Sequence, residues 1–208
     1  MGGRGQRKGG GGGGGKWSDS ISSYQIPEKL EDAIGEKGEP RSIATAQWES
    51  NPYYSDYYRE FSQNCQRVVW AYEMQRRGYD VEALPTYKGD TMPMTANWSN
   101  VMSGVTRVSV AGRNNAKVIQ NIESQLKQWG EGARAIIRIR WQGCNSGHVI
   151  NVEYTNGKIY YVDAQDRYRS TNPKEMLSGS RASETELFRV DNATITDEMR
   201  KVVKKRSK

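Results

Sequence analysis

Three side chains of this sequence can together carry out cysteine-based acyl chemistry. Cys65 supplies a thiol where a helix is predicted to begin, His148 is the single histidine, and Asp163 follows it in the chain. A thiol, an imidazole and a carboxylate that meet in space are the minimum set for a cysteine nucleophile, its base and an orienting acid. The unpaired N–H groups at a helix start also favour the thiolate form of a cysteine. We therefore take Cys65, His148 and Asp163 as candidate catalytic residues.

A hairpin is predicted to bring the histidine and the aspartate together. Asn156-Gly157 lies between two alternating apolar segments, which is typical of a two-residue hairpin loop. With these two residues in the loop, His148 faces Gln165 and lies diagonal to Asp163. Because directly opposed residues share a face of a sheet, all three side chains are expected on the same side of the hairpin, within reach of an imidazole–carboxylate hydrogen bond.

Each candidate also has a purely structural interpretation. A lone histidine on a strand is commonly a packing residue, and Cys65 could be a small buried hydrophobe. Cys144 is a second possible nucleophile four residues before His148, but no helix start follows it. Gly143 and Gly147 could permit close approach of a substrate or could simply form a turn.

The order of predicted elements indicates an α+β domain with a small antiparallel sheet. Asn64 is expected to cap a helix that runs from Cys65 to Gly78, and the clearest apolar stripe predicts a helix over 115–129. Strands are predicted at 79–85, 133–141, 147–154, 158–165 and 186–190, and a short helix at 172–177. Residues 88–112 are expected to be irregular and anchored by Trp98 and Val101.

Composition suggests three parts: a flexible, basic, glycine-rich arm and lead-in over 1–44, a catalytic domain over 45–195, and a basic helix or tail over 196–208. The net charge of +7 is uneven, because residues 1–16 and 197–208 each carry +4 and the middle is left with −1. Weak contact of the basic ends with nucleic acid is therefore expected at most.

Several other classes of protein are not expected. Two cysteines do not form a disulfide scaffold, and one histidine without a close cysteine pair argues against a metal site or cofactor. No apolar run is long enough for a membrane span, and the basic N-terminal arm is not followed by the apolar stretch of a signal peptide.

Two parts of the sequence resemble the papain-fold toxin domains that are predicted to be glutamine deamidases. Residues 64–67, 71–74 and 76–81 are similar to the nucleophile segment of that family. Residues 147–152, Gly157 and 161–165 are similar to its histidine and aspartate segments. The resemblance covers roughly 47–195, and such domains occur in bacterial polymorphic toxins and in phage or prophage head-associated proteins.

The resemblance implies a papain-like fold in which the nucleophile helix packs on a small antiparallel sheet. It also implies roles for the candidate residues: Cys65 as nucleophile, His148 as general base and then acid, and Asp163 as the residue that orients His148. An oxyanion hole needs two donors, and the second could be Gln63 or Gln165.

Three functions then compete. The first is deamidation of glutamine in a host or target protein. The second is another papain-like reaction, by a peptidase or a transglutaminase, and the third is a non-catalytic virion or interaction module. The resemblance implies a protein substrate that presents a glutamine, and an immunity protein or phage head proteins as further partners. The protein would act in a phage virion or after delivery into the cytoplasm of a target cell, without a membrane partner.

Overall fold

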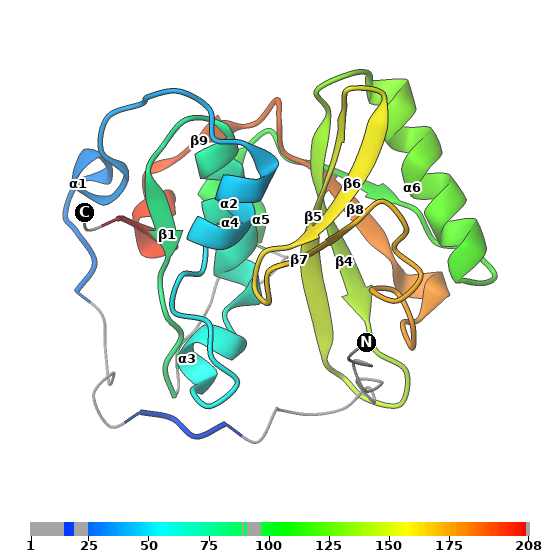
Figure 1. Ribbon diagram of the computed structural model, residues 1–208, viewed down its shortest axis with the longest axis horizontal. Coiled ribbons are helices and arrows are strands. Elements are labelled where there is room, and N and C mark those ends of the chain that lie inside the picture. Colours follow the sequence, from blue (N-terminus) through cyan, green and yellow to red (C-terminus); the bar gives the residue numbers. More distant parts are fainter. Residues whose placement is uncertain (1–14, 19–24, 89, 91–96, 207–208) are drawn as a thin grey trace.

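The computed structural model describes residues 15–18, 25–88, 90 and 97–206, and its centre is a six-stranded antiparallel sheet between helices (Figure 1). The strand order is β3-β8-β4-β5-β6-β7. The bounds are β3 Thr106–Ser109, β4 Arg134–Arg140, β5 Gly147–Thr155, β6 Lys158–Asp163, β7 Tyr168–Ser170 and β8 Glu186–Arg189. Helices on an antiparallel sheet confirm the predicted α+β class.

Helix α4, Cys65–Arg76, packs on one face of the sheet and against strand β1, Val81–Ala83. It is buried on most of its circumference, so its sequence carries only a weak amphipathic pattern. Its buried apolar residues are Val68, Val69, Trp70, Ala71, Tyr72 and Met74. A strand residue also fastens the helix to the sheet, because Asn151 of β5 donates an amide hydrogen bond to the Val69 carbonyl at 3.0 Å.

Helix α6, Asn115–Trp129, covers the opposite face (Figure 1). Its apolar stripe packs against inward-facing residues of β4 and β5 such as Ile137 and Ile150. The stripe consists of Val118, Ile122 and Leu126. The side chain of Asn114 caps the helix by accepting a hydrogen bond from the Lys117 N–H at 2.9 Å. The predicted bounds of this helix are confirmed.

The β5–β6 hairpin has the predicted register. Thr155 pairs with Lys158 and Asn151 pairs with Val162. Asn156 and Gly157 both have positive φ, 51° and 70°, as the tightest hairpin loop requires. The register therefore places His148 and Asp163 on one side of the hairpin, as their spacing predicts.

A second layer joins the lead-in to the C-terminal segment. Strand β1 pairs with β10, Val203–Lys205, which also packs against α1, Leu30–Ile34. Residues 196–208 are predicted as a helix or tail outside the domain, but Met199, Val202 and Val203 are buried in its core. Residues 1–14 of the predicted arm lie outside the described residues.

The remaining elements are short. They are α2 Ile43–Glu49, α3 Arg59–Ser62, α5 Trp98–Val101, β2 Met102–Ser103, η2 Ala182–Glu184, β9 Thr194–Ile195 and η3 Asp197–Lys201. Two expectations fail among them. The helix expected over 172–177 is a series of turns, and the region expected to be irregular contains β3, an edge strand of the sheet. Trp98 and Val101 do anchor that region, at 1% and 2% exposure.

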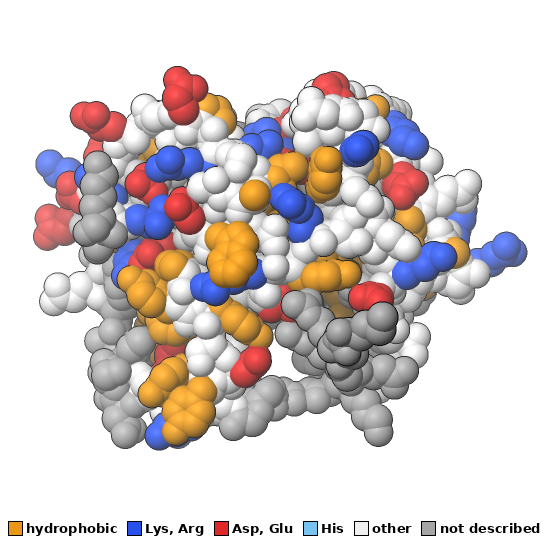
Figure 2. Space-filling view, viewed as in Figure 1, with side chains coloured by type: hydrophobic (Ala, Val, Ile, Leu, Met, Phe, Trp, Pro, Cys, Tyr) orange, Lys and Arg blue, Asp and Glu red, His pale blue; other side chains and the backbone are white. Residues whose placement is uncertain are grey.

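The molecular surface mixes the two signs of charge. Figure 2 shows Lys and Arg side chains interspersed with Asp and Glu on one face. Among the described residues, no helix combines the length and the apolar character that a membrane crossing requires.

The packing of β10 predicts that the C-terminal segment contributes to the stability of the domain. Val203→Ala removes buried methyl groups and should lower the free energy of unfolding by about 1.5–3 kcal/mol. Lys205→Ala, on the same strand but exposed, should change it by less than about 0.5 kcal/mol. Urea denaturation of both variants measures the difference, and equal effects would mean that β10 is not part of the folded core.

Candidate active site

The start of helix α4 places Cys65 at the edge of the buried core. Cys65 is half-buried and is the first residue of the helix. Its N–H belongs to the first turn, whose donors have no partner within the helix. Asn64 occupies the cap position, but its side chain does not cap the helix as predicted. It is buried and donates instead to Asn51 Oδ1 at 3.2 Å and to the Leu84 carbonyl at 3.4 Å.

The three residues that the sequence singles out meet at this point. His148 Nε2 lies 2.7 Å from Asp163 Oδ2. The side chain of Cys65 lies beside His148, close enough to help raise the pKa of the imidazole. Since Nε2 contacts the carboxylate, the other ring nitrogen, Nδ1, is left for the thiol. One imidazole therefore bridges a thiol on a helix and a carboxylate on a strand, the order that cysteine acyl enzymes use.

The surroundings of His148 favour its protonated form. Burial lowers the pKa of the imidazole, but the charge of Asp163, the hydrogen bond to it and the neighbouring Cys65 side chain outweigh burial. The pKa of His148 therefore stands well above its ordinary value. A protonated imidazole can give its proton to a leaving group, as the acid step of cysteine acyl chemistry requires.

An aromatic ring that the sequence analysis did not single out covers the imidazole. Trp141 follows β4 and stacks on His148, with ring centroids 6.5 Å apart and planes tilted by 13°. The Trp141 N–H donates to the Ser146 carbonyl at 3.1 Å, which closes the loop between β4 and β5. In the sequence, Trp141 is only the last member of an alternating strand pattern. Its position over the ring depends on the pairing of β4 with β5.

Gly147 has a structural role beside the histidine. A Cβ atom at this position would lie 2.3 Å from the carbonyl oxygen of Ile139, so no larger residue fits in the strand pair. This close backbone packing at Gly147 is neither of the two interpretations that its sequence suggested, a substrate approach or a turn. The loop glycine Gly143 has φ +74°, which is the conformation of a turn.

Gln165 and Asn51 connect the aspartate to the segment that precedes Cys65. The Gln165 N–H donates to Asp163 Oδ1 at 3.2 Å, and its side-chain amide donates to the Ser62 carbonyl. Asn51 donates to the carbonyls of Gln165, at 3.1 Å, and Phe61, at 2.8 Å. Asn51 is fully buried, and the sequence analysis missed it because its partners are distant in the chain.

The other predicted oxyanion residue, Gln63, has a different environment. It is half-buried at the end of α3, and its backbone N–H donates to the Arg59 carbonyl at 2.9 Å. Among the described residues its side chain forms no hydrogen bond. Gln63 lies near Cys65 because it precedes it by two residues, and Gln165 lies near it because its amide donates to the Ser62 carbonyl. Of the two side-chain amides, only that of Gln165 is held by a hydrogen bond among the described residues.

Cys144, the second cysteine, lies in the loop between β4 and β5. Its sulfur lies 3.0 Å from Ser146 Oγ, and hydrogen bonds from the side chain and backbone of Ser146 lower the pKa of the Cys144 thiol. Within the described part of the chain no hydrogen bond joins this thiol to His148. Cys65 is thus the cysteine that contacts the imidazole.

A metal site is not formed by the described residues. Among them no group of three or more His, Cys, Asp or Glu side chains is arranged to hold a metal ion.

The sequence model of one protein family, described as "Papain fold toxin 1, glutamine deamidase", matches residues 63–168, half of the chain. The chain belongs to this family. The matched span starts at Gln63 and includes Cys65, His148, Asp163 and Gln165, whereas Asn51 and Ser62 lie before it. Comparisons with curated proteins and with solved structures found no match.

The contact between His148 and Asp163 predicts how the only imidazole of this papain-fold domain titrates. Asp163→Asn removes the charge that raises the pKa of His148 and leaves the burial that lowers it. The pKa, which stands well above its ordinary value in the wild type, should fall in the variant. Proton NMR measures it without ambiguity, because one histidine gives one set of ring signals. Asp197→Asn, on the exposed η3 segment, is the control and should leave the titration unchanged.

The same contact links stability to pH. Because the pKa of His148 is raised on folding, the stability that it contributes is complete below the unfolded-state value of about 6.5 and is lost as the pH rises through the folded-state pKa. The difference in unfolding free energy between wild type and Asp163→Asn should therefore be largest below about pH 6.5 and should shrink at higher pH. A difference that grows as the pH rises would contradict a raised pKa.

Proposed function

We propose that the protein deamidates glutamine side chains of a target protein, with Cys65 as nucleophile, His148 as proton carrier and Asp163 as the residue that orients His148. The observation that carries the proposal is the bridging position of His148, between the thiol at the start of α4 and the carboxylate on β6. The domain's membership of a deamidase family supports glutamine as the side chain that is attacked.

The reaction needs two proton transfers through one imidazole. The Cys65 thiolate attacks the carboxamide carbon of glutamine, and the C=O electrons move to oxygen to give a tetrahedral oxyanion. Collapse of this intermediate breaks the C–N bond, and protonated His148 gives its proton to the departing ammonia. The neutral imidazole then takes a proton from water, whose oxygen attacks the thioester. The C–S bond breaks, and glutamate and free Cys65 are left.

Two N–H donors are available for the oxyanion. One is the backbone N–H of Cys65, which has no partner within the helix. The second is the side-chain amide of Gln165. One of its two N–H bonds is committed to the Ser62 carbonyl, which holds the group in place and leaves the other for the substrate. Gln165 also contacts Asp163 through its backbone, so one residue links the oxyanion hole to the acid.

Substitution of the two cysteines tests the nucleophile. We expect Cys65→Ala to abolish ammonia release, because no other group can form the thioester, while the fold is retained. Cys144→Ser should keep wild-type activity, since Cys144 does not contact His148. The substrates are a blocked glutamine–glycine dipeptide and denatured casein, and a glutamate dehydrogenase assay measures ammonia. Activity that survives in Cys65→Ala would reject the assignment.

The products of the casein assay distinguish deamidation from related reactions. Intact-mass spectrometry of casein shows deamidation as replacement of an amide NH₂ by OH in an unbroken chain. A peptidase would instead give fragments, and a transglutaminase would give crosslinked or amine-modified chains. Fragments or crosslinks that form with the wild type but not with Cys65→Ala would show that the protein is a peptidase or a transglutaminase and not a deamidase.

The oxyanion proposal makes a separate prediction. Gln165→Ala should lower kcat by about 10²–10³-fold, because it removes a donor that acts on the transition state. Gln63→Ala is the matched control and should lower kcat much less, because its amide is not held by the described residues. Circular dichroism and the NMR signal of His148 should stay unchanged in both variants. The opposite ranking would assign the second donor to Gln63.

A further inference from the structure

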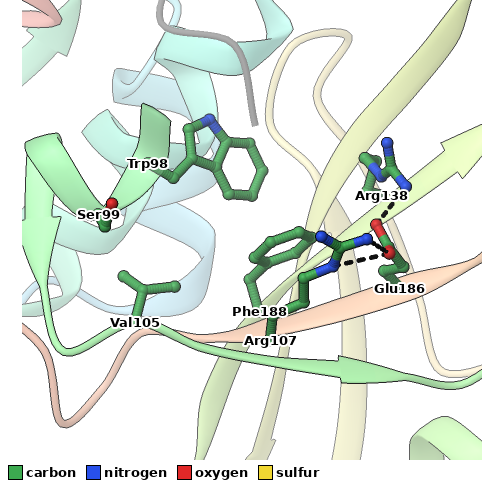
Figure 3. Close-up of a pocket in the computed structure, with 7 residues that line it drawn as sticks. All are labelled: Trp98, Ser99, Val105, Arg107, Arg138, Glu186 and Phe188. Carbon is green, nitrogen blue, oxygen red and sulfur yellow. Dashed lines mark hydrogen bonds and ion pairs between the residues drawn. The ribbon is translucent and has the colours of Figure 1, made fainter. Parts of the chain in front are cut away.

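A pocket of about 270 Å³ lies on the α4 side of the sheet, and no step of the proposed reaction uses it. Figure 3 shows the side chains that line it, with Trp98 from α5 opposite residues of β3, β4 and β8. The residues that matter here are Trp98, Phe188, Arg107, Arg138 and Glu186. The strand pairing brings four of them together, because Arg107 is opposite Phe188 and Arg138 is opposite Glu186.

Two contacts connect this pocket with the candidate active site. Trp98 Nε1 donates to the side-chain oxygen of Gln66 at 3.3 Å, and Gln66 follows Cys65 directly in the chain. On the other side, Arg138 is paired across the sheet with Val149, which follows His148. The pocket thus has Gln66, which is next to Cys65, on one side, and Arg138, whose strand partner Val149 is next to His148, on the other. Trp98 therefore connects the pocket to the residue next to the thiol, and an extended segment with its glutamine at Cys65 can reach toward the pocket.

The pocket carries an excess of positive charge. Arg107 and Arg138 both pair with the single carboxylate of Glu186, with Arg107 Nε at 2.8 Å from it (Figure 3). Two guanidinium groups and one carboxylate leave one positive charge. The Arg107 side chain is 65% exposed, and its Nη1 forms no hydrogen bond with the described residues. The Nε of Arg138 is buried and also has no hydrogen-bond partner among them.

Apart from Ser99, the rest of the pocket is apolar. Trp98 and Phe188 are 1% and 4% exposed, and their rings meet edge to face with centroids 4.8 Å apart. A side chain with methylene groups and a terminal carboxylate matches both parts, because its stem packs on the rings and its charge meets Arg107. A lysine at the same place would bring a third cation to two guanidinium groups, and this repulsion excludes it.

We propose that this pocket is a substrate subsite that binds an acidic side chain, preferably glutamate, close in sequence to the target glutamine. Arg107 supplies the contact with the carboxylate, and Arg138 and Glu186 hold Arg107 in position. The proposal rests on the deamidase function proposed above, because it places the target glutamine at Cys65. It deepens that function by naming the sequence context that the domain selects.

Binding measurements with an inactive protein test the subsite separately from catalysis. Short peptides blocked at both ends carry a central glutamine, with Glu, Met or Lys scanned through the flanking positions. The full chain carries Cys65→Ala, so that calorimetry measures binding without turnover. At one flanking position we expect the Glu peptide to bind about five- to tenfold more tightly than the Lys peptide, and this preference to shrink with added salt.

Substitution of Arg107 then identifies the group responsible. Arg107→Gln should reduce the preference to about twofold or less, and Arg107→Glu should reverse it in favour of Lys. Arg113→Gln, at an exposed arginine outside this pocket, should leave the preference intact. Circular dichroism checks that each variant is folded.

Three results would overturn the subsite: equal binding of Glu and Lys peptides, no binding of any peptide, or a Glu preference that survives Arg107→Gln. Failure of the deamidase proposal gives a different pattern. In that case the wild-type protein releases no ammonia from the same peptides, while the Glu preference and its dependence on Arg107 remain.

Discussion

The candidate site depends on the docking of helix α4 on strand β5, because that contact alone brings the Cys65 thiol to the His148 imidazole. Cys65 and His148 are far apart in the chain and come from different elements, whereas His148 and Asp163 belong to one hairpin. A small rotation of the helix would separate the sulfur from the ring and leave the His148–Asp163 pair intact. How accurately the Cys65 sulfur is placed beside the His148 ring therefore depends on how accurately one helix–sheet interface is packed.

Buried polar groups orient that interface as well as apolar packing. Glu73 of α4 is fully buried and pairs with Arg134 of β4 at 2.8 Å and with Arg77 at 2.7 Å. Burial opposes the charge of Arg134, but the contact with Glu73 outweighs it and raises the pKa of the guanidinium. Such pairs add little net stability, yet an unpaired partner is costly, so they disfavour other helix positions. The Asn151–Val69 hydrogen bond acts in the same direction nearer the site.

The surroundings of His148 fix the position of its ring from several elements. Asp163 holds one nitrogen, Trp141 covers a face of the ring, and the other nitrogen is left for the thiol. Behind them, Asn51 and Gln165 join the loop after β6 to the segment before Cys65. Gln66, next to Cys65 in α4, contacts Trp98 of the charged pocket, so the groups proposed for reaction and for selection are connected through one helix.

Local patterns determined a large part of this molecule. The bounds of α6, the start of α4 and the register of the β5–β6 hairpin follow from apolar spacing and from the Asn-Gly turn, and the register alone predicts the His148–Asp163 contact. Only the tertiary structure decided which residues from other elements meet them: Trp141 over the ring, Asn51 beneath the helix start, Arg107 in the pocket and β10 beside β1. Neighbours within a helix or hairpin are set by the periodicity of the backbone. Contacts between elements depend on burying apolar surface and pairing polar groups across the whole molecule at once. No local sequence pattern contains that information.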